Sequence, residues 1–217
     1  MLEKNPGKLL TDLMRSTKAV LIVVDVQNDF CHSEGAFSKK NVDLSHIQKI
    51  IVPNIVSLIR KCRKSNLPII FIRTIHSGWT NSPSWQGRIG GMAKKTPICL
   101  PDSWGAKFYK VKPDSSDCIV TKHRYSAFTG TDLDLILRSK GIETVLICGV
   151  ATNVCVETTA RDGFNLNYNV ILIEDCCGAF SLEEHESALN SVRKYFGNVT
   201  ESKGLMKILG RGKIKWR

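Results

Sequence analysis

The stretch ETVLICGVATNVCVETTARDGFNLNYNVILIED, residues 143–175, predicts a strand, a helix and a second strand in succession. Residues 143–150 and 169–175 are short apolar runs rich in β-branched side chains, which are typical of strands buried on both faces of a sheet. Between them, Thr152 or Asn153 can cap a helix. Because strands joined through a helix usually run parallel, this stretch predicts part of a parallel sheet.

The same alternation of strand and helix signals runs through most of the chain. It predicts a three-layer αβα fold of the α/β class, in which helices cover both faces of a six-stranded, mostly parallel sheet. No internal repeat or domain boundary is visible, so we expect a single domain over residues 1–217, with a core at about 18–200 and a basic tail at 203–217. The other predicted elements are strands at 19–24, 68–74, 118–121 and 198–202, and helices at 44–65, 131–140 and 181–196.

Individual residues indicate where several of these helices start and stop. Thr131 is the expected N-cap of one helix, and Gly141 is its expected stop. Ser181 is followed three residues later by Glu184, which is the pattern of a capping box. Pro53 is expected to mark an early turn or a kink in the helix that contains it.

Residues 76–115 break the alternation. This segment contains four Pro and five Gly, so we expect a long excursion with little regular structure. Long loops of this kind in compact domains often carry function.

The composition is that of an ordinary folded protein, with 42% apolar and 24% charged residues. This excludes a disordered chain, a collagen and a coiled coil. No run of 18 apolar residues is present, so we expect no membrane-spanning helix. The first residues lack the apolar segment of a secretory signal.

The net charge of +11 is distributed unevenly along the chain. Residues 61–115 carry +8 and residues 203–217 carry +6, whereas residues 116–202 carry −5. Two basic surface regions on a globular protein are one explanation, since charge reports on solubility and association rather than on the fold. A nucleic-acid-binding surface is the other explanation.

The eight cysteines include no C-x-x-C pair and no Cys/His cluster with zinc spacing. Reduced thiols of this kind, in a chain without a recognisable secretory signal, predict a cytoplasmic protein. Most of them are expected to be small core residues. The adjacent Cys176 and Cys177 leave a thiol redox function open, although no resolving C-x-x-C accompanies them.

Three reactive side chains lie at the ends of predicted strands or just beyond them. Asp25 ends the first strand, Lys122 ends the third, and Cys155 lies in the first turn of the helix after the fourth. In open parallel sheets, ligands bind outside the carboxyl ends of the strands, where the strand order reverses. We therefore expect the carboxyl group of Asp25, the amine of Lys122 and the thiol of Cys155 to meet at one edge of the sheet.

Each of the three has a possible chemical role. Cys155 is expected at the second or third position of its helix, where free N–H groups and the helix dipole favour a thiolate and can hold an oxyanion. Lys122 would further favour the thiolate, and Asp25 could accept the thiol proton. The structural alternatives are a packing cysteine, a solvated lysine and an aspartate that caps a turn.

Several aromatic residues fall in loops near the predicted strand ends and could wall a pocket. Ordinary packing within the loops is the alternative. These residues are Phe30, Trp79, Trp85, Trp104 and Tyr125.

Three blocks of the sequence resemble the signature motifs of the isochorismatase-like cysteine hydrolases. They are VLIVVDVQNDF at 20–30, KHRYSAF at 122–128 and GVATNVCVETTARDGF at 149–164. The resemblance covers about residues 18–200, and the third block is the most specific. It implies a six-stranded parallel sheet between helices, in agreement with the fold expected from the strand and helix pattern.

The resemblance also implies a catalytic triad of Asp25, Lys122 and Cys155. Cys155 would attack an amide or ureido carbonyl and form a thioester, with Asp25 as general base and then as proton donor. Lys122 would steady the charges. A cis peptide bond between Val150 and Ala151 would direct the N–H groups of Ala151 and Cys155 at the oxyanion.

Within the family, the motifs look most like those of ureidoacrylate amidohydrolase, biuret hydrolase and N-carbamoylsarcosine amidase, which cleave small linear ureido or carbamoyl compounds. Siderophore-type isochorismatases usually lack the cysteine. Nicotinamidases carry a metal site at a T-x-D-x-H segment, which here is RTIHSGW at 73–79 and has no Asp. The aspartate that would bind a metal together with His76 is thus absent, and we expect no metal and no cofactor. Phe30, Trp79, Trp85 and Tyr125 are the expected substrate-binding residues.

The resemblance further implies a homo-oligomer, a dimer or a tetramer, that acts on a small molecule without a membrane or nucleic-acid partner. Two alternatives stay open. One is a hydrolase for a nicotinamide-like or isochorismate-like substrate. The other is a non-catalytic binding protein that keeps the fold and uses its basic surface.

Overall fold

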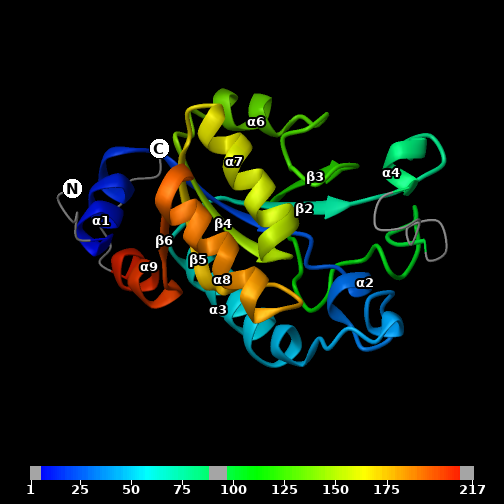
Figure 1. The fold of residues 1–217 in the computed structure, drawn as a ribbon. Coiled ribbons are helices and arrows are strands. Elements are labelled where there is room, and N and C mark those ends of the chain that lie inside the picture. The colour runs from blue at the N-terminus through cyan, green and yellow to red at the C-terminus, as the bar shows by residue number, and fades with distance from the viewer. Residues whose placement is uncertain (1–5, 88–96, 211–217) are drawn as a thin grey trace.

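The computed structural model describes residues 6–87 and 97–210, and in these parts of the chain strands alternate with helices (Figure 1). Three of the helical segments, Ile47–Ile51, Thr152–Val156 and Val192–Phe196, are π-helical turns, and Ser38–Lys40 is a 3₁₀ turn. In chain order the elements are α1 (Pro6–Ser16), β1 (Ala19–Val24), α2 (Asn28–Cys31), η1 (Ser38–Lys40), η2 (Ile47–Ile51), α3 (Val52–Lys64), β2 (Ile69–Thr74), α4 (Pro83–Gly87), β3 (Cys118–Lys122), α6 (Leu133–Ser139), β4 (Thr144–Val150), η3 (Thr152–Val156), α7 (Glu157–Asn165), β5 (Asn169–Gly178), α8 (Leu182–Ser191), η4 (Val192–Phe196), β6 (Asn198–Thr200) and α9 (Ser202–Leu209).

The strands form one parallel sheet in the order β3-β2-β1-β4-β5-β6. The chain builds β1 to β3 outward in one direction, returns to place β4 beside β1, and then builds β5 and β6 outward in the other direction. The strand order therefore reverses between β1 and β4, which is where ligands bind in such sheets. The predicted three-layer α/β fold is confirmed.

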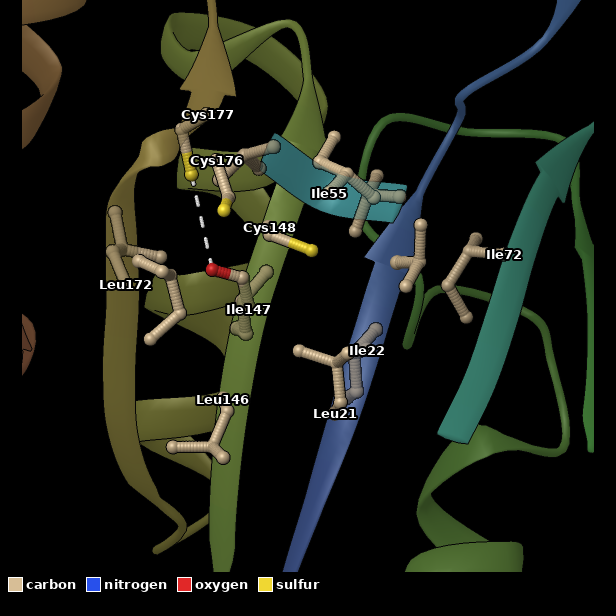
Figure 2. Close-up of a cluster of buried hydrophobic side chains, with 14 of the residues drawn as sticks. Leu21, Ile22, Ile55, Ile72, Leu146, Ile147, Cys148, Leu172, Cys176 and Cys177 are labelled. Carbon is tan, nitrogen blue, oxygen red and sulfur yellow. Dashed lines mark hydrogen bonds between the residues drawn. The ribbon is translucent and has the colours of Figure 1, made fainter. Parts of the chain in front are cut away.

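Helices cover both faces of this sheet (Figure 1). α3 and α9 pack together on one face, and α7 and α8 lie on the other. Every residue of β1 and β4 is buried, because these two strands occupy the centre of the sheet. Figure 2 shows Leu21 and Ile22 of β1 near Leu146 and Ile147 of β4 in the core.

Three of the cysteines in this core lie close together. Cys148 of β4 lies near Cys176 and Cys177 of β5, all three are buried, and the Cys177 thiol donates to the Ile147 carbonyl with a 3.8 Å separation (Figure 2). Burial raises the pKa of each of these thiols well above its ordinary value. A buried, protonated thiol is a poor nucleophile, so Cys176 and Cys177 pack the core and give no support to the redox alternative.

The helix predicted over 44–65 is confirmed, with an irregular start. Its segment η2 is π-helical and ends directly before Val52 and Pro53, where α3 begins. Proline lacks the N–H that would donate to the preceding turn, and its ring crowds the carbonyl four residues back. The wider π turn provides one way to accommodate this proline, so the expected irregularity lies just before Pro53.

The predicted helix ends are mostly correct. Ser181 caps α8 by accepting from the Glu184 N–H at 3.4 Å. Gly141 follows the C-cap of α6 with a φ of +64°, which a glycine adopts without strain. α6 starts later than predicted, because Asp132 occupies the cap position while the Thr131 hydroxyl accepts from the Leu133 N–H.

Two helices at the ends of the chain were not predicted. Leu10 and Met14 of α1 are buried four residues apart, as are Leu205 and Leu209 of α9. This spacing places each pair on one helix face, which packs into the core. Residues 203–209 of the predicted basic tail therefore belong to a helix that packs into the core, whereas residues 211–217 lie outside the described residues. None of the described helices is long and apolar enough to cross a membrane.

Candidate active site

Asp25, Lys122 and Cys155 converge at the carboxyl ends of β1, β3 and β4. The Lys122 Nζ lies 2.7 Å from the Asp25 Oδ2 and donates to the Cys155 Sγ at 3.4 Å. The Asp25 and Lys122 side chains are each only 1% exposed, whereas Cys155 is partly accessible. The structure thus brings together the carboxylate, the amine and the thiol that we expected at one edge of the sheet.

Thr74 at the end of β2 is a fourth member of this cluster, and the sequence reasoning missed it. Its hydroxyl donates to the Asp25 Oδ1 at 3.0 Å and accepts from the Lys122 Nζ at 2.7 Å. Thr74 is 3% exposed and pairs with Lys122 in the β2–β3 register. The Asp25 carboxylate is thus held at one oxygen by the Thr74 hydrogen bond and at the other by the ion pair with Lys122.

Gln27 fixes the position of Thr74 in turn. Its buried Nε2 donates to the carbonyls of Thr74 and Ala106, both at 2.9 Å, and its Oε1 accepts from the Thr74 N–H at 2.7 Å. The end of β1, the end of β2 and the loop at Ala106 are thereby tied together beneath the cluster.

The protonation states differ from those expected. Burial and the neighbouring Asp25 carboxylate raise the pKa of the Cys155 thiol to about 12, despite the opposing charge of Lys122. This direction is opposite to that of the thiolate-favouring effects expected from the sequence, namely the helix start and Lys122. Burial alone would lower the pKa of Lys122, but Asp25 and Cys155 outweigh this effect and raise it, so the amine is an ammonium at neutral pH.

Cys155 lies on the π-helical turn η3, which starts one residue after the cis peptide bond between Val150 and Ala151. Ala151 occupies the cap position, rather than Thr152 or Asn153 as predicted, so Cys155 is the fourth residue of the turn. In an α-helix the Ala151 carbonyl would accept from Cys155.

In η3 the Ala151 carbonyl accepts instead from Val154 and Val156, both at 3.1 Å. The backbone N–H of Cys155 is thus released from the bond that an α-helix would give it.

Gly149 allows β1 and β4 to approach closely beneath this turn. Its φ is +127°, and a Cβ at this position would lie 2.0 Å from the Val24 carbonyl oxygen. Any side chain would push the two strands apart, and with them Asp25 and the η3 turn.

A mostly apolar cavity of ≈ 390 Å³ opens above the cluster. It has the size and composition of a small-molecule site. The expected residues Phe30, Trp85 and Tyr125 line it, as do the strand-end residues of the cluster. Sequence reasoning did not assign further lining residues to the site, namely Phe37, Lys40, Arg124, Phe180 and Glu184.

Trp79 does not reach the cavity, so its assignment as a substrate-binding residue is not supported by the structure. Its side chain is fully exposed. Ser77 and Thr80 close a tight turn that carries Trp79. The Ser77 N–H donates to the Thr80 hydroxyl at 3.0 Å, and the Thr80 N–H donates to the Ser77 carbonyl at 3.1 Å. Trp85, six residues further on, instead packs against His76 and Tyr125, with ring centroids 5.5 and 4.8 Å apart.

His185 of α8 lies beside the site. Its side chain is partly buried and its Nδ1 lies 2.9 Å from the Thr152 Oγ1. It therefore supports the first residue of the η3 turn from α8. Burial and His46 outweigh Glu186 and lower the pKa of His185.

Within residues 6–87 and 97–210, no group of three or more His, Cys, Asp or Glu side chains is arranged to hold a metal ion. His76, the histidine in RTIHSGW, lines the cavity and packs against Trp85.

Comparison with known proteins agrees with this architecture. The isochorismatase domain model matches residues 19–204. Ureidoacrylate amidohydrolase RutB of Acinetobacter baylyi is 31% identical over 206 residues, which span 87% of this chain and 82% of that protein. A cysteine hydrolase from Pseudomonas syringae pv. phaseolicola 1448A has a similar solved structure, with a TM-score of 0.79 and 26% identity over 98% of this chain and 97% of that one. For N-carbamoylsarcosine amidase from Thermoplasma acidophilum the TM-score is 0.69, with 28% identity over 85% of this chain and 96% of that one.

Proposed function

Because this chain belongs to the isochorismatase family, we propose that it is an amidohydrolase that cleaves the C–N bond of a small linear amide, ureido or carbamoyl compound, with Cys155 as the nucleophile. The observation that carries the proposal is the contact of one buried ammonium, Lys122, with both the Asp25 carboxylate and the Cys155 thiol. A base, a nucleophile and a fixed positive charge are the parts that acyl transfer through a thioester requires.

In the first step the Asp25 carboxylate accepts the Cys155 proton as the sulfur attacks the substrate carbonyl. Asp25 has to take this proton because the thiol is protonated at rest, with its pKa raised to about 12. The proton moves only as the C–S bond forms, which is general base catalysis. Lys122 stays charged and stabilises the developing thiolate.

The attack places a negative charge on the carbonyl oxygen. We assign its stabilisation to the backbone N–H groups of Ala151 and Cys155. Ala151 lies at the cap of the η3 turn, where N–H groups have no intrahelical acceptor. The N–H of Cys155 lacks its α-helical acceptor because the Ala151 carbonyl is occupied by other donors. Fixed backbone donors of this kind contribute strongly to acyl transfer.

Collapse of the tetrahedral intermediate then breaks the C–N bond. The protonated Asp25 gives its proton to the departing nitrogen, so ammonia or an amine leaves and a thioester remains on Cys155. Asp25, again a carboxylate, activates a water molecule that attacks the thioester carbonyl. The C–S bond breaks, the acid product leaves, and the Cys155 sulfur recovers a proton through Asp25.

Similarity to relatives supports the substrate class. Ureidoacrylate amidohydrolase and N-carbamoylsarcosine amidase are both named for small ureido or carbamoyl compounds. The scheme needs no cofactor, since the residues of this chain supply the base, the nucleophile and the oxyanion donors. A cytoplasmic location and a homo-oligomer, dimer or tetramer, stay predictions.

The test is ammonia release from a panel of compounds: ureidoacrylate, biuret, N-carbamoylsarcosine, nicotinamide and simple aliphatic amides. We expect at least one ureido or carbamoyl compound to be hydrolysed in preference to nicotinamide. Acid quenching during turnover, followed by intact-protein mass spectrometry, should show an acyl group on Cys155. Hydrolysis of nicotinamide alone would move the protein to a different substrate class, and no hydrolysis of any compound would count against the proposal.

A further inference from the structure

The cavity that contains Cys155 also holds a guanidinium group whose donors are only partly used. Arg124 lies two residues after Lys122 and lines the same cavity. Its backbone carbonyl accepts from the Lys122 Nζ at 3.0 Å, which ties Arg124 directly to the catalytic cluster. The backbone of Arg124 therefore lies beside the reacting groups, and Arg124 lines the cavity that contains them.

Two contacts hold this guanidinium in place. Its Nη1 donates to the carbonyls of Thr80 and His123, at 2.9 and 2.7 Å. The Arg124 guanidinium also lies over the Trp85 ring, with its carbon 4.9 Å from the ring centroid. Trp85 itself is packed between His76 and Tyr125. A guanidinium fixed at one nitrogen and stacked on an aromatic face loses little freedom when it binds a further group.

The remaining donors of Arg124 form one edge of the guanidinium. Both N–H groups of Nη1 are accounted for by the Thr80 and His123 carbonyls, and among the described residues the Nε and Nη2 of Arg124 have no hydrogen-bond partner. The Nε–H and one Nη2–H point in parallel, which is the geometry that binds the two oxygens of a carboxylate.

The charge balance of the cavity also favours an anion. Its described lining carries three cationic side chains, Lys40, Lys122 and Arg124, against two carboxylates, Asp25 and Glu184. Asp25 is already neutralised by Lys122 at 2.7 Å. Glu184 lies exposed in the first turn of α8, where solvent screens its charge.

We infer that the Nε/Nη2 edge of Arg124 binds a carboxylate of the substrate, so that the enzyme selects anionic amides or ureides over neutral ones. This inference rests on the proposed hydrolase function and specifies its substrate class. The carboxylate would lie a few bonds from the scissile carbonyl, because Arg124 is rooted beside Lys122. Arg124 acts as a specificity residue and takes no part in the proton transfers.

The test compares each acid with its methyl ester, which has nearly the same shape but no charge. Ureidoacrylate and N-carbamoylsarcosine and their methyl esters serve as probes, with ammonia release as the readout. For the wild type we expect kcat/KM to be about 10- to 100-fold higher for at least one acid than for its ester, as for a charged hydrogen-bonded pair. In Arg124→Gln this ratio should fall to near one, mainly through the KM of the acid, and Arg124→Lys should restore only part of it.

Arg138→Gln is the matched control. Arg138 also lies over an aromatic ring, that of Tyr168, but it is an exposed residue of α6 outside the cavity lining. Its replacement should leave the ratio of acid to ester unchanged. A wild-type enzyme that hydrolyses each ester as well as its acid, or an acid preference that survives in Arg124→Gln, would overturn the inference while leaving the hydrolase function intact.

A binding measurement separates the two proposals. Calorimetry with Cys155→Ser should show that at least one acid binds more tightly than its ester, and that adding Arg124→Gln removes the difference. If the acid binds in this way but the wild type releases no ammonia from it, the anion site stands and the hydrolase function fails for that compound. If no acid binds more tightly than its ester, the anion site is wrong.

Discussion

Thr74 and Lys122 are register partners at the ends of the parallel strands β2 and β3, and the Lys122 Nζ donates to the Thr74 Oγ1 at 2.7 Å. The same hydroxyl donates to the Asp25 Oδ1 at 3.0 Å. The ammonium and the carboxylate are thus joined twice, directly and through Thr74. Thr74 and Lys122 therefore hold the Asp25 carboxylate together.

Thr74→Val keeps the shape of this side chain but removes both hydrogen bonds. We expect kcat to fall about 10- to 100-fold and the free energy of unfolding to fall by about 1–3 kcal/mol, because buried polar groups of Asp25 and Lys122 lose a partner. Thr74→Ser should restore most of the activity. The measurements are steady-state kinetics and urea unfolding. A Ser variant as inactive as the Val variant would show that the methyl group, rather than the hydroxyl, matters at this position.

Asp25→Asn should separate thiol reactivity from turnover. The Asp25 charge helps to raise the pKa of Cys155 to about 12, so removing it should lower that pKa. Each unit of decrease raises the thiolate fraction at pH 8 about tenfold. Iodoacetamide should therefore modify the Cys155 peptide faster in the variant, whereas hydrolysis should fall at least about 100-fold for lack of a base.

Mass spectrometry of the Cys155 peptide measures this alkylation, with Asp134→Asn on the exposed side of α6 as the control variant. If alkylation and hydrolysis both decrease, Asp25 supports the local structure and the general base lies elsewhere.

Lys122→Met should destabilise the protein by leaving the Asp25 carboxylate buried without a charge partner. Removal of one member of a buried ion pair costs about 3–5 kcal/mol, and we expect a loss of this size in urea unfolding at pH 7. The double variant Asp25→Asn/Lys122→Met should recover much of it. Equal stability of the single and double variants would mean that Asp25 is not the group left uncompensated.

The pair also predicts how stability depends on alkaline pH. The pKa of Lys122 is raised above its ordinary value of 10.5, so its charge stabilises the folded state fully below that value. This contribution should be lost as the pH rises through the higher folded-state pKa. Urea unfolding between pH 9 and 11.5 should therefore show a steeper loss for the wild type than for the double variant.

His185 predicts a pH dependence on the acid side. Its pKa is lowered from 6.5, mainly by burial, so the folded state favours the neutral ring that contacts Thr152. This contribution should be complete above pH 6.5 and decrease as the pH falls below it. His185→Gln has no titrating ring, so its stability relative to the wild type should improve between pH 6.5 and 5. A constant difference over this range would show that protonation of His185 does not affect the fold.

Much of the site could be predicted from the sequence because its main residues lie at strand ends. Asp25, Lys122 and Cys155 lie at or after apolar runs, and a parallel sheet brings such positions to one edge. Thr74 occupies the same kind of position, but a threonine at a strand end has no distinctive chemistry. Only the register with Lys122 shows its role.

The remaining features depend on contacts that no local pattern encodes. The direction of Trp79 is set by the Ser77–Thr80 turn, and the protonation of Cys155 depends on its burial beside Asp25. Helix α9 was missed because basic residues obscured the spacing of its buried leucines. The π form of η3 is recognised only from the hydrogen bonds of Ala151.

The central claim is that Cys155 is the nucleophile, and its most direct test is ammonia release by wild type and Cys155→Ser on the best substrate of the panel. The variant should stay folded, with an unfolding midpoint close to that of the wild type, because the change replaces one atom. We predict that its kcat falls at least about 10⁴-fold, as when a nucleophile is removed from a triad that acts as a unit. A folded Cys155→Ser protein that retains more than a few per cent of wild-type turnover would contradict the account.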